Sequence, residues 1–141
     1  HKYFATPAVN MVYALEKSLS IITEFGLPAY YEKHTRMAAK VRAALTTVGF
    51  ELVSKHPAPT LSVFKYPDGI EDAAFRSKLA VKGVIVASAL AELQGKAFRM
   101  GHMGSVTEDE LLVALKRMLE VCQELGVKVD KGQALNAFLE A

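Results

Sequence analysis

The chain has 141 residues, of which 51% are hydrophobic and 23% are charged, and its formal net charge at pH 7 is +2. This length and balance are those of one globular domain with a real core, and they exclude an intrinsically disordered chain. The weak, dispersed positive charge argues against a nucleic-acid partner. No apolar run is long enough to span a bilayer, so no membrane partner is expected.

The chain contains a single cysteine, Cys122, so no intramolecular disulfide can form. A cytoplasmic, reducing location is therefore predicted. Cys122 falls on the apolar face of a predicted helix, which favours a buried, unreactive thiol. The histidines lack the spacing of a zinc site, and we expect no metal.

Two long helices are predicted at the N-terminal end. Thr6 and Pro7 form a helix opening, with a hydroxyl at the N-cap and a proline at the first helical position. Apolar residues recur at helical spacing up to Gly26, which ends the first helix. The second helix is predicted from Pro28, and Gly49 ends it.

Beyond Gly49 the apolar pattern changes and mixes strands with shorter helices. Strands are predicted at residues 50–53, 61–66, 84–87 and 96–100, and helices at residues 71–82, 107–126 and 131–139. Thr107 and Glu110 have the spacing of a capping box. The order predicts an α+β fold: a small, mostly antiparallel sheet covered on one face by helices and preceded by two long helices.

The strand predicted at residues 96–100 carries one arginine, Arg99, and the segment Gly101-His102-Met103-Gly104 follows it. A guanidinium is planar and permanently charged, and it matches a carboxylate with two hydrogen bonds. By residue type alone, the alternative interpretation is an edge-strand arginine that is paired with a nearby glutamate or simply solvated. His102 is better interpreted as a turn histidine than as a proton-transfer group. Composition and spacing therefore indicate an anion-binding arginine and no complete catalytic set.

Several stretches together resemble the C-terminal part of class V, pyridoxal-phosphate-dependent aminotransferases of the alanine–glyoxylate and serine–pyruvate type. Residues 3–7, Tyr3-Phe4-Ala5-Thr6-Pro7, are similar to the segment downstream of the cofactor lysine in those enzymes. Residues 22–27 and His34 fit the next two helices. Residues 95–104, GKAFRMGHMG, are similar to the family's GKxxRIGxxG strand, the most specific of these signals.

The resemblance implies the small domain of the fold-type I aminotransferase architecture. It assigns residues 1–26 to an interdomain helix and residues 27–141 to the small domain. It also implies that Arg99 binds the α-carboxylate of an amino-acid or keto-acid substrate, where a bidentate guanidinium fixes the orientation without exchanging a proton.

The resemblance also implies cofactor contacts at the start of the chain. Tyr3 and Thr6 fall where the family has hydroxyls that reach the phosphate of pyridoxal 5'-phosphate in the neighbouring subunit of a homodimer. Phe4 and Ala5 stand where close relatives often have two histidines, so the local polar contacts are expected to differ.

The implied reaction of the full-length enzyme transfers an amino group between an amino acid of the alanine or serine type and a 2-oxo acid such as glyoxylate or pyruvate. The Schiff-base lysine, the acid partner of the pyridine nitrogen and the stacking aromatic belong to a large upstream domain and have no match here. The chain begins at His1 without a methionine, which indicates a piece of a longer protein or a tag remnant. The fragment alone is expected to lack catalytic residues, bound cofactor and activity.

Other functions stay open on the sequence. One is a free-standing α+β regulatory module that binds a small carboxylate at Arg99, and another is a purely structural dimerisation domain. A lyase or a desulfurase of the same family also stays open, although the position of Cys122 in a helix argues against a desulfurase. The sequence does not name the amino donor or acceptor.

Overall fold

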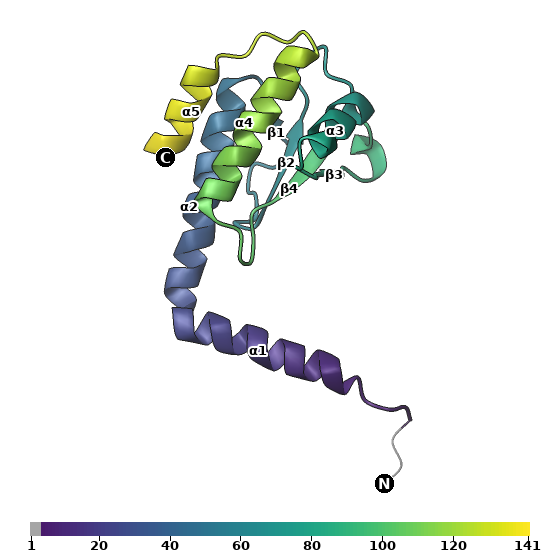
Figure 1. The fold of residues 1–141 in the computed structure, drawn as a ribbon, viewed down its shortest axis with the longest axis vertical. Helices are drawn as coiled ribbons and strands as arrows, with labels where there is room; N and C mark the ends of the chain where they lie inside the picture. Colours follow the sequence, from purple (N-terminus) through teal and green to yellow (C-terminus); the bar gives the residue numbers. More distant parts are fainter. Residues whose placement is uncertain (1–3) are drawn as a thin grey trace. The chain divides into compact units, whose positions relative to one another are not determined.

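The computed structural model describes residues 4–141, which form two compact units, residues 4–33 and residues 34–141. The elements are α1 (Val9–Phe25), α2 (Leu27–Thr47), β1 (Glu51–Leu52), β2 (Leu61–Lys65), α3 (Asp72–Val81), β3 (Ala87–Ser88), the 3-10 turn η1 (Ala91–Leu93), β4 (Ala97–Gly101), α4 (Glu108–Glu124) and α5 (Lys131–Glu140). Figure 1 labels the α-helices and the strands. The α+β class is confirmed. The interdomain role of residues 1–26 and the small-domain assignment of residues 27–141 stay predictions.

Helix α1 begins at Val9 and not at Pro7. Ala8 has φ −77° and ψ 68°, and the Val9 N–H donates to the Pro7 carbonyl at 2.9 Å, which together form an inverse γ-turn. No side chain caps α1, so the prediction of Thr6 as its N-cap is wrong. The physical reason is the turn at Ala8, which starts the helix beyond the reach of the Thr6 hydroxyl. Gly26 ends α1 as predicted, with φ 91°.

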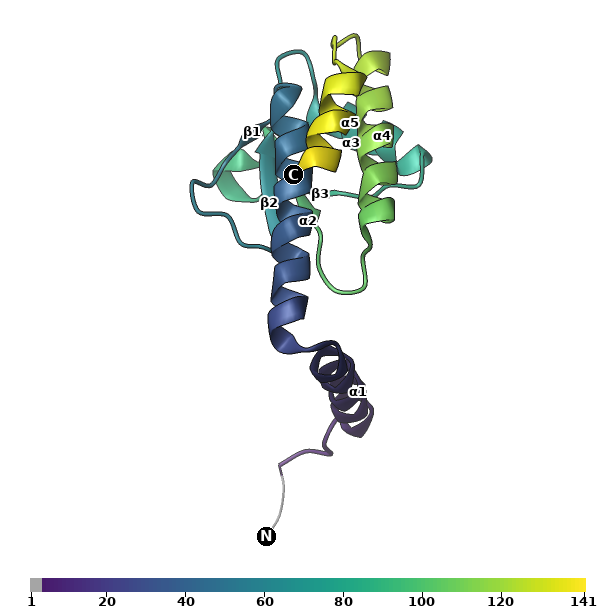
Figure 2. The ribbon, with the colours of Figure 1, turned by 90° about the vertical axis from the view of Figure 1, so that its left-hand side faces the viewer.

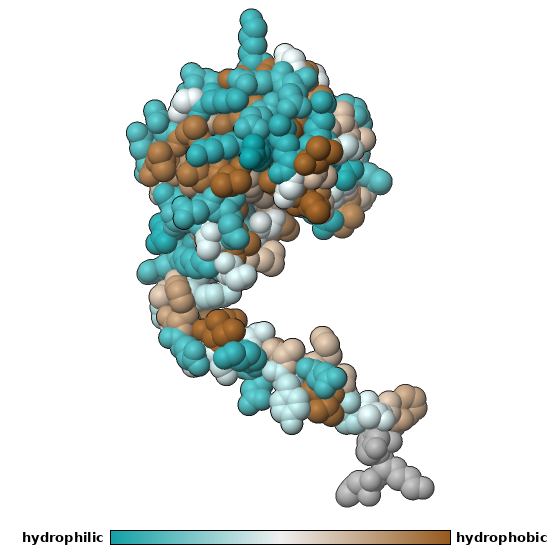
Figure 3. All heavy atoms as spheres, in the orientation of Figure 1, coloured by the Kyte–Doolittle hydropathy of each residue, from teal (hydrophilic) through white to brown (hydrophobic). Residues whose placement is uncertain are grey.

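The apolar side chains of α1 are not buried within the described chain. Leu15, Leu19 and Ile21 are each more than half exposed, and no residue of this helix is buried. Figure 3 shows apolar side chains on the surface of this segment. Exposed apolar surface of this extent is typical of a helix that takes part in an interface.

The sheet of the second unit has the strand order β1-β2-β4-β3, and each pair of neighbours is antiparallel. This confirms the predicted antiparallel sheet. Along β2 and β4, alternate residues face opposite sides. The pair Phe64 and Phe98 is fully buried, whereas the adjacent pair Val63 and Arg99 is only partly buried.

The core lies between the helices and the face of the sheet that carries Phe64 and Phe98. Their rings belong to an aromatic cluster with Phe50, Tyr66 and Phe75, in which ring centroids lie 5.3–6.5 Å apart. Figure 2 shows α2, α5 and α4 side by side. The helices complete the core with buried apolar side chains, including Met37, Val41, Leu45, Leu79, Leu115, Met118, Leu119, Cys122 and Phe138.

The strand predicted at residues 84–87 is displaced, and only Ala87 and Ser88 pair with β4. Gly83 has φ 81°, and the Val84 N–H donates to the Leu79 carbonyl of α3 at 3.1 Å. This hydrogen bond is part of the C-terminal cap of α3. The Val84 N–H is therefore used to cap the C-terminal end of α3 and is not available to a strand. The residues that follow Val84 connect α3 to the sheet.

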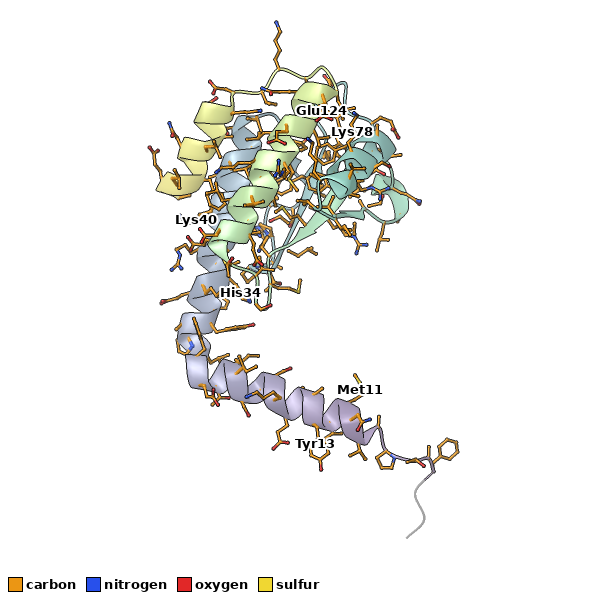
Figure 4. All side chains as sticks on the ribbon, viewed as in Figure 1. Met11, Tyr13, His34, Lys40, Lys78 and Glu124 are labelled. Atoms are coloured by element: carbon orange, nitrogen blue, oxygen red, sulfur yellow. The ribbon has the colours of Figure 1, made fainter. Side chains whose placement is uncertain are left out.

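Helix α4 begins at the predicted capping box. The Thr107 hydroxyl accepts from the Glu110 N–H at 3.2 Å, and the Glu110 carboxylate accepts from the Thr107 N–H at 2.8 Å. An ion pair of 3.2 Å between Lys78 of α3 and Glu124 of α4 joins the two helices at the surface (Figure 4). Within residues 4–141 no helix is both long enough and apolar enough to cross a membrane.

Candidate substrate-binding site

Arg99 lies in the middle of β4, between two neighbouring strands. Its register partners are Val63 of β2 on one side and Ala87 of β3 on the other. Because side chains alternate along a strand, Arg99 points away from the aromatic face that carries Phe98. Its side chain is partly buried on the face of the sheet opposite the core.

The guanidinium of Arg99 is held by backbone and not by a carboxylate. Its Nε donates to the Ser88 carbonyl at 2.9 Å. Among residues 4–141, the arginines that form ion pairs are Arg36, Arg76 and Arg117, and Arg99 is not one of them. The interpretation of Arg99 as an ion-paired edge residue is therefore not supported within this part of the chain. Its two terminal nitrogens remain available to an anion.

The loop that follows β4 is fastened to the rest of the domain by its backbone. The His102 N–H donates to the Thr60 carbonyl at 3.0 Å, and the Gly104 N–H donates to Nε2 of His34 at 3.2 Å. Figure 4 labels His34 on α2. Because both N–H groups have acceptors in the protein, this glycine-flanked loop does not offer them to a bound anion.

A buried polar chain connects α2, β2 and this loop. Nε of Arg42 donates to the Ser62 hydroxyl at 2.9 Å, and Ser62 Oγ lies 3.0 Å from Nε2 of His102. Burial, reinforced by the positive charge of Arg42, lowers the pKa of His102 to about 4. His102 is therefore neutral near pH 7 and shut off from solvent, which suits a structural role. Arg42 and His102 are 60 positions apart in the sequence, so no local pattern signalled this contact.

The predicted cofactor contacts lie at the start of the chain. Tyr3 is outside the described residues. Thr6 is exposed and belongs to the first unit, whereas Arg99 belongs to the second. The Thr6 hydroxyl is not used as a helix cap, so it retains its capacity to bind another group.

The remaining candidate groups do not form a reactive site. Cys122 is fully buried, and burial raises the pKa of its thiol to about 12. No group of three or more potential metal ligands occurs among residues 4–141. A cavity of about 520 Å³ lies between the segment 83–86 and α4, but Arg99 does not line it.

Comparisons with known proteins relate the chain to aminotransferases, although no family model matches it. It is 41% identical over 127 residues to an uncharacterised aminotransferase of Methanocaldococcus jannaschii, covering 88% of this chain and 33% of that protein. It is 30% identical over 139 residues to the serine–glyoxylate aminotransferase of Hyphomicrobium methylovorum, covering 96% of this chain and 34% of that protein.

The fold agrees with the sequence matches. The pyridoxamine–pyruvate aminotransferase of Mesorhizobium loti superposes with a TM-score of 0.91 at 26% identity, covering 99% of this chain and 37% of that one. The chain thus spans about a third of the length of the curated relatives it matches. In sequence and in fold the chain is therefore similar to part of larger proteins, and these homologues and structural neighbours are class V aminotransferases.

Proposed function

We propose that this chain is the carboxylate-binding domain of a longer enzyme that transfers an amino group between an amino acid and a 2-oxo acid. The expected donors are of the alanine or serine type, and the expected acceptors are glyoxylate or pyruvate. The observation that carries the proposal is Arg99, whose guanidinium has no carboxylate partner among residues 4–141 and whose strand resembles the family pattern. The aminotransferase names of the relatives support this function over a free-standing regulatory module.

The role of Arg99 follows from the groups that remain on its guanidinium. Because Nε is engaged by the Ser88 carbonyl, the two terminal nitrogens form the fork that meets a carboxylate. Two parallel hydrogen bonds fix both the position and the rotation of the bound acid. Because the guanidinium is permanently charged, it orients the substrate without taking part in proton transfer.

The cofactor implied by the family is pyridoxal 5'-phosphate, which when bound supplies an electron sink for chemistry at the α-carbon. The exposed Thr6 hydroxyl, which does not cap α1, has the donor chemistry that a phosphate requires. We assign Thr6, together with Tyr3, to the phosphate of the neighbouring subunit in a homodimer. The exposed apolar surface of α1 supports an interface there.

The chain's own residues bind and orient, and we assign none of them to catalysis. The lysine and the ring-binding residues are proposed to lie in a large domain of the longer enzyme, so the 141-residue chain alone is expected to be inactive. The lone, buried Cys122 supports a reducing compartment, which we propose to be the cytoplasm.

Steady-state kinetics of the full-length enzyme test the proposal, with Arg99→Ala as the variant. The KM for the amino acid and for the 2-oxo acid is expected to rise by roughly tenfold to a hundredfold, because charged hydrogen bonds contribute about 1.5–3 kcal/mol. Arg36→Ala is the matched control. Arg36 is an exposed arginine of α2, and it forms an ion pair of 2.7 Å with Glu108 of α4. A wild-type enzyme without transaminase activity, or equal KM changes in both variants, would contradict the proposal.

Calorimetry on the 141-residue chain separates this function from a regulatory module. Alanine, serine, glyoxylate and pyruvate are expected to bind weakly or not at all, because one arginine supplies only part of a site. Tight binding that is lost in Arg99→Ala would favour the module.

A further inference from the structure

The carbonyl that anchors Arg99 faces the outer edge of the sheet. Ala87 of β3 is the register partner of Arg99. Two residues further on, the Ala89 N–H donates to the Ala97 carbonyl of β4 at 2.9 Å. In an antiparallel pair, the backbone groups of alternate residues point toward the neighbouring strand and away from it. The backbone groups of Ala87 and Ala89 therefore point toward β4, and the carbonyl of Ser88, which lies between them, points away from β4.

The side chain of Arg99 has to cross β3 to reach this carbonyl. Among residues 4–141, β3 is the last strand in the order β1-β2-β4-β3, so the Ser88 carbonyl faces the open edge of the sheet. Nε of Arg99 nevertheless donates to that carbonyl at 2.9 Å. The stem of the arginine therefore passes over β3, and its terminal nitrogens are brought to the outer edge of this strand.

Two alanines flank the path of the arginine. Because side chains alternate along a strand, register partners lie on the same face of a sheet, and so do residues two positions apart. Ala87 and Ala89 are thus on the face that carries Arg99, one on each side of Ser88. Ala87 is exposed, whereas Ala89 is only 3% exposed. Both side chains end at the β-carbon, which leaves room for the stem of the arginine above β3.

The neighbour of Arg99 on the other side is larger. Val63 of β2 is its second register partner and is partly buried. A longer side chain at position 87 would stand roughly perpendicular to the sheet, in the space that the arginine stem needs. An exposed alanine does not fill the core, and alanine is less favourable in a strand than a β-branched residue. The small size of Ala87 is therefore explained by the path of Arg99 and not by the stability of β3.

We propose that Ala87 is a positioning residue of the substrate-binding site, whose small side chain lets Arg99 cross β3 and present its terminal nitrogens at the outer edge of that strand. This inference rests on the proposed binding of a substrate carboxylate by Arg99. It also assigns the carboxylate to the edge of the sheet beside Ser88, and not to the centre of the sheet. Ala87 has no polar side-chain group to offer the substrate, and it acts only through the arginine.

The test is a double-mutant cycle in the full-length holoenzyme between Ala87→Leu and Arg99→Ala. In the wild-type background, Ala87→Leu is expected to raise the KM for the amino acid and for the 2-oxo acid about tenfold with kcat nearly unchanged, because the group that binds the carboxylate is displaced. In the Arg99→Ala background, the same substitution should leave KM unchanged, since the side chain that it obstructs is gone.

The effect should follow the size of the side chain at position 87. Ala87→Val should raise KM about threefold, with the same dependence on Arg99, and it provides the test if Ala87→Leu fails to fold. Ala87→Gly should keep a KM close to that of the wild type, because glycine leaves the path open. Because Ala87 is exposed, the urea midpoints of the leucine and valine variants are expected to stay close to the wild-type value.

Ala80→Leu is the matched control for enlarging an exposed alanine. Ala80 is an exposed residue of α3. Phe75 of the same helix packs against Phe98 with ring centroids 5.6 Å apart, so α3 lies on the face of the sheet opposite Arg99. Ala80→Leu should therefore leave KM unchanged in either background.

The outcomes separate the two proposals. If Arg99→Ala raises KM but the leucine and valine variants of Ala87 leave KM unchanged, or raise it equally in both backgrounds, the positioning role is wrong and the proposed function stands. If Arg99→Ala leaves the KM of an active enzyme unchanged, the assignment of Arg99 is wrong, and the positioning role fails with it.

Discussion

Nε of Arg99 lies 2.9 Å from the carbonyl oxygen of Ser88, on the edge strand β3. The arginine is therefore oriented by a backbone group that no side-chain substitution removes directly. A carbonyl carries no net charge, so this contact leaves the positive charge of the guanidinium for a ligand. The chemistry expected of Arg99 depends on both the charge and the fork that extends beyond Nε.

Replacing Arg99 by lysine separates charge from geometry. Arg99→Lys keeps a positive charge but provides no planar fork to bind a carboxylate with two hydrogen bonds. In the full-length enzyme, the KM for the amino acid is expected to rise about tenfold, less than in Arg99→Ala, because part of the charge-assisted interaction survives. Initial-rate kinetics of the three proteins check the order. A lysine variant with wild-type KM would show that bidentate binding is not required.

The free energy of unfolding is expected to depend on pH through His102. Its pKa in the folded protein is about 4, below the ordinary value of 6.5, chiefly because the ring is buried. The unfolded chain therefore binds the proton more tightly. The stability that the neutral ring provides is complete above pH 6.5, and it is lost progressively as the pH falls from 6.5 towards 4. The stability lost over this pH range is on the order of 3 kcal/mol, because each tenfold difference in proton affinity between the folded and the unfolded chain corresponds to about 1.4 kcal/mol.

Urea unfolding of the chain at pH 7 and pH 5 measures this effect. His102→Asn should be less stable at pH 7, with a smaller loss of stability between the two pH values than the wild type. His56→Gln is the control, because His56 is exposed and should leave the pH dependence unchanged. An unaltered pH dependence in His102→Asn would contradict the assignment.

The capping box of α4 is expected to contribute measurably to stability. Thr107→Ala removes the acceptor for the Glu110 N–H, and the unfolding free energy should fall by about 1 kcal/mol. Thr107→Ser keeps the hydroxyl and should stay close to the wild type. Urea midpoints of the three proteins provide the comparison. An equal loss in the alanine and serine variants would mean that the hydroxyl does not act as the cap.

Cys122 is expected to be inert in the folded protein. Its side chain is fully buried, and burial raises the pKa of the thiol to about 12, so almost no thiolate exists at pH 8. A thiol-reactive chromogenic disulfide should modify the native chain much more slowly than the chain in 6 M guanidinium. Equally fast modification in both conditions would show that the thiol is accessible in the native state.

Local chemistry made several features predictable from the sequence. The capping box depends on Thr107 and Glu110, which are three residues apart, so their spacing alone predicted the start of α4. Gly26 ends α1 for an equally local reason, because glycine readily adopts the positive φ found at this helix end. Arg99 emerged as a binding candidate from its residue type and from the motif around it.

Thr6 shows where local reasoning was insufficient. A hydroxyl followed by a proline is a common helix start, yet the turn at Ala8 moved the start of α1 to Val9. The strand expected at residues 84–87 was displaced for a comparable reason, because the cap of α3 took the Val84 N–H. In both cases a backbone hydrogen bond that the apolar pattern does not reveal, from Val9 to Pro7 or from Val84 to Leu79, decided where the helix or strand begins.

The sequence by itself determined that the chain is an α+β domain whose sheet carries one candidate arginine, since apolar periodicity and caps are local properties. Only the tertiary structure decided which groups surround that arginine. Ser88 lies beside Arg99 because the register of β3 on β4 brings the Ser88 carbonyl within hydrogen-bond distance of the arginine. Register and packing depend on the whole fold, so the anchor of Arg99 could not be predicted from residue type or spacing.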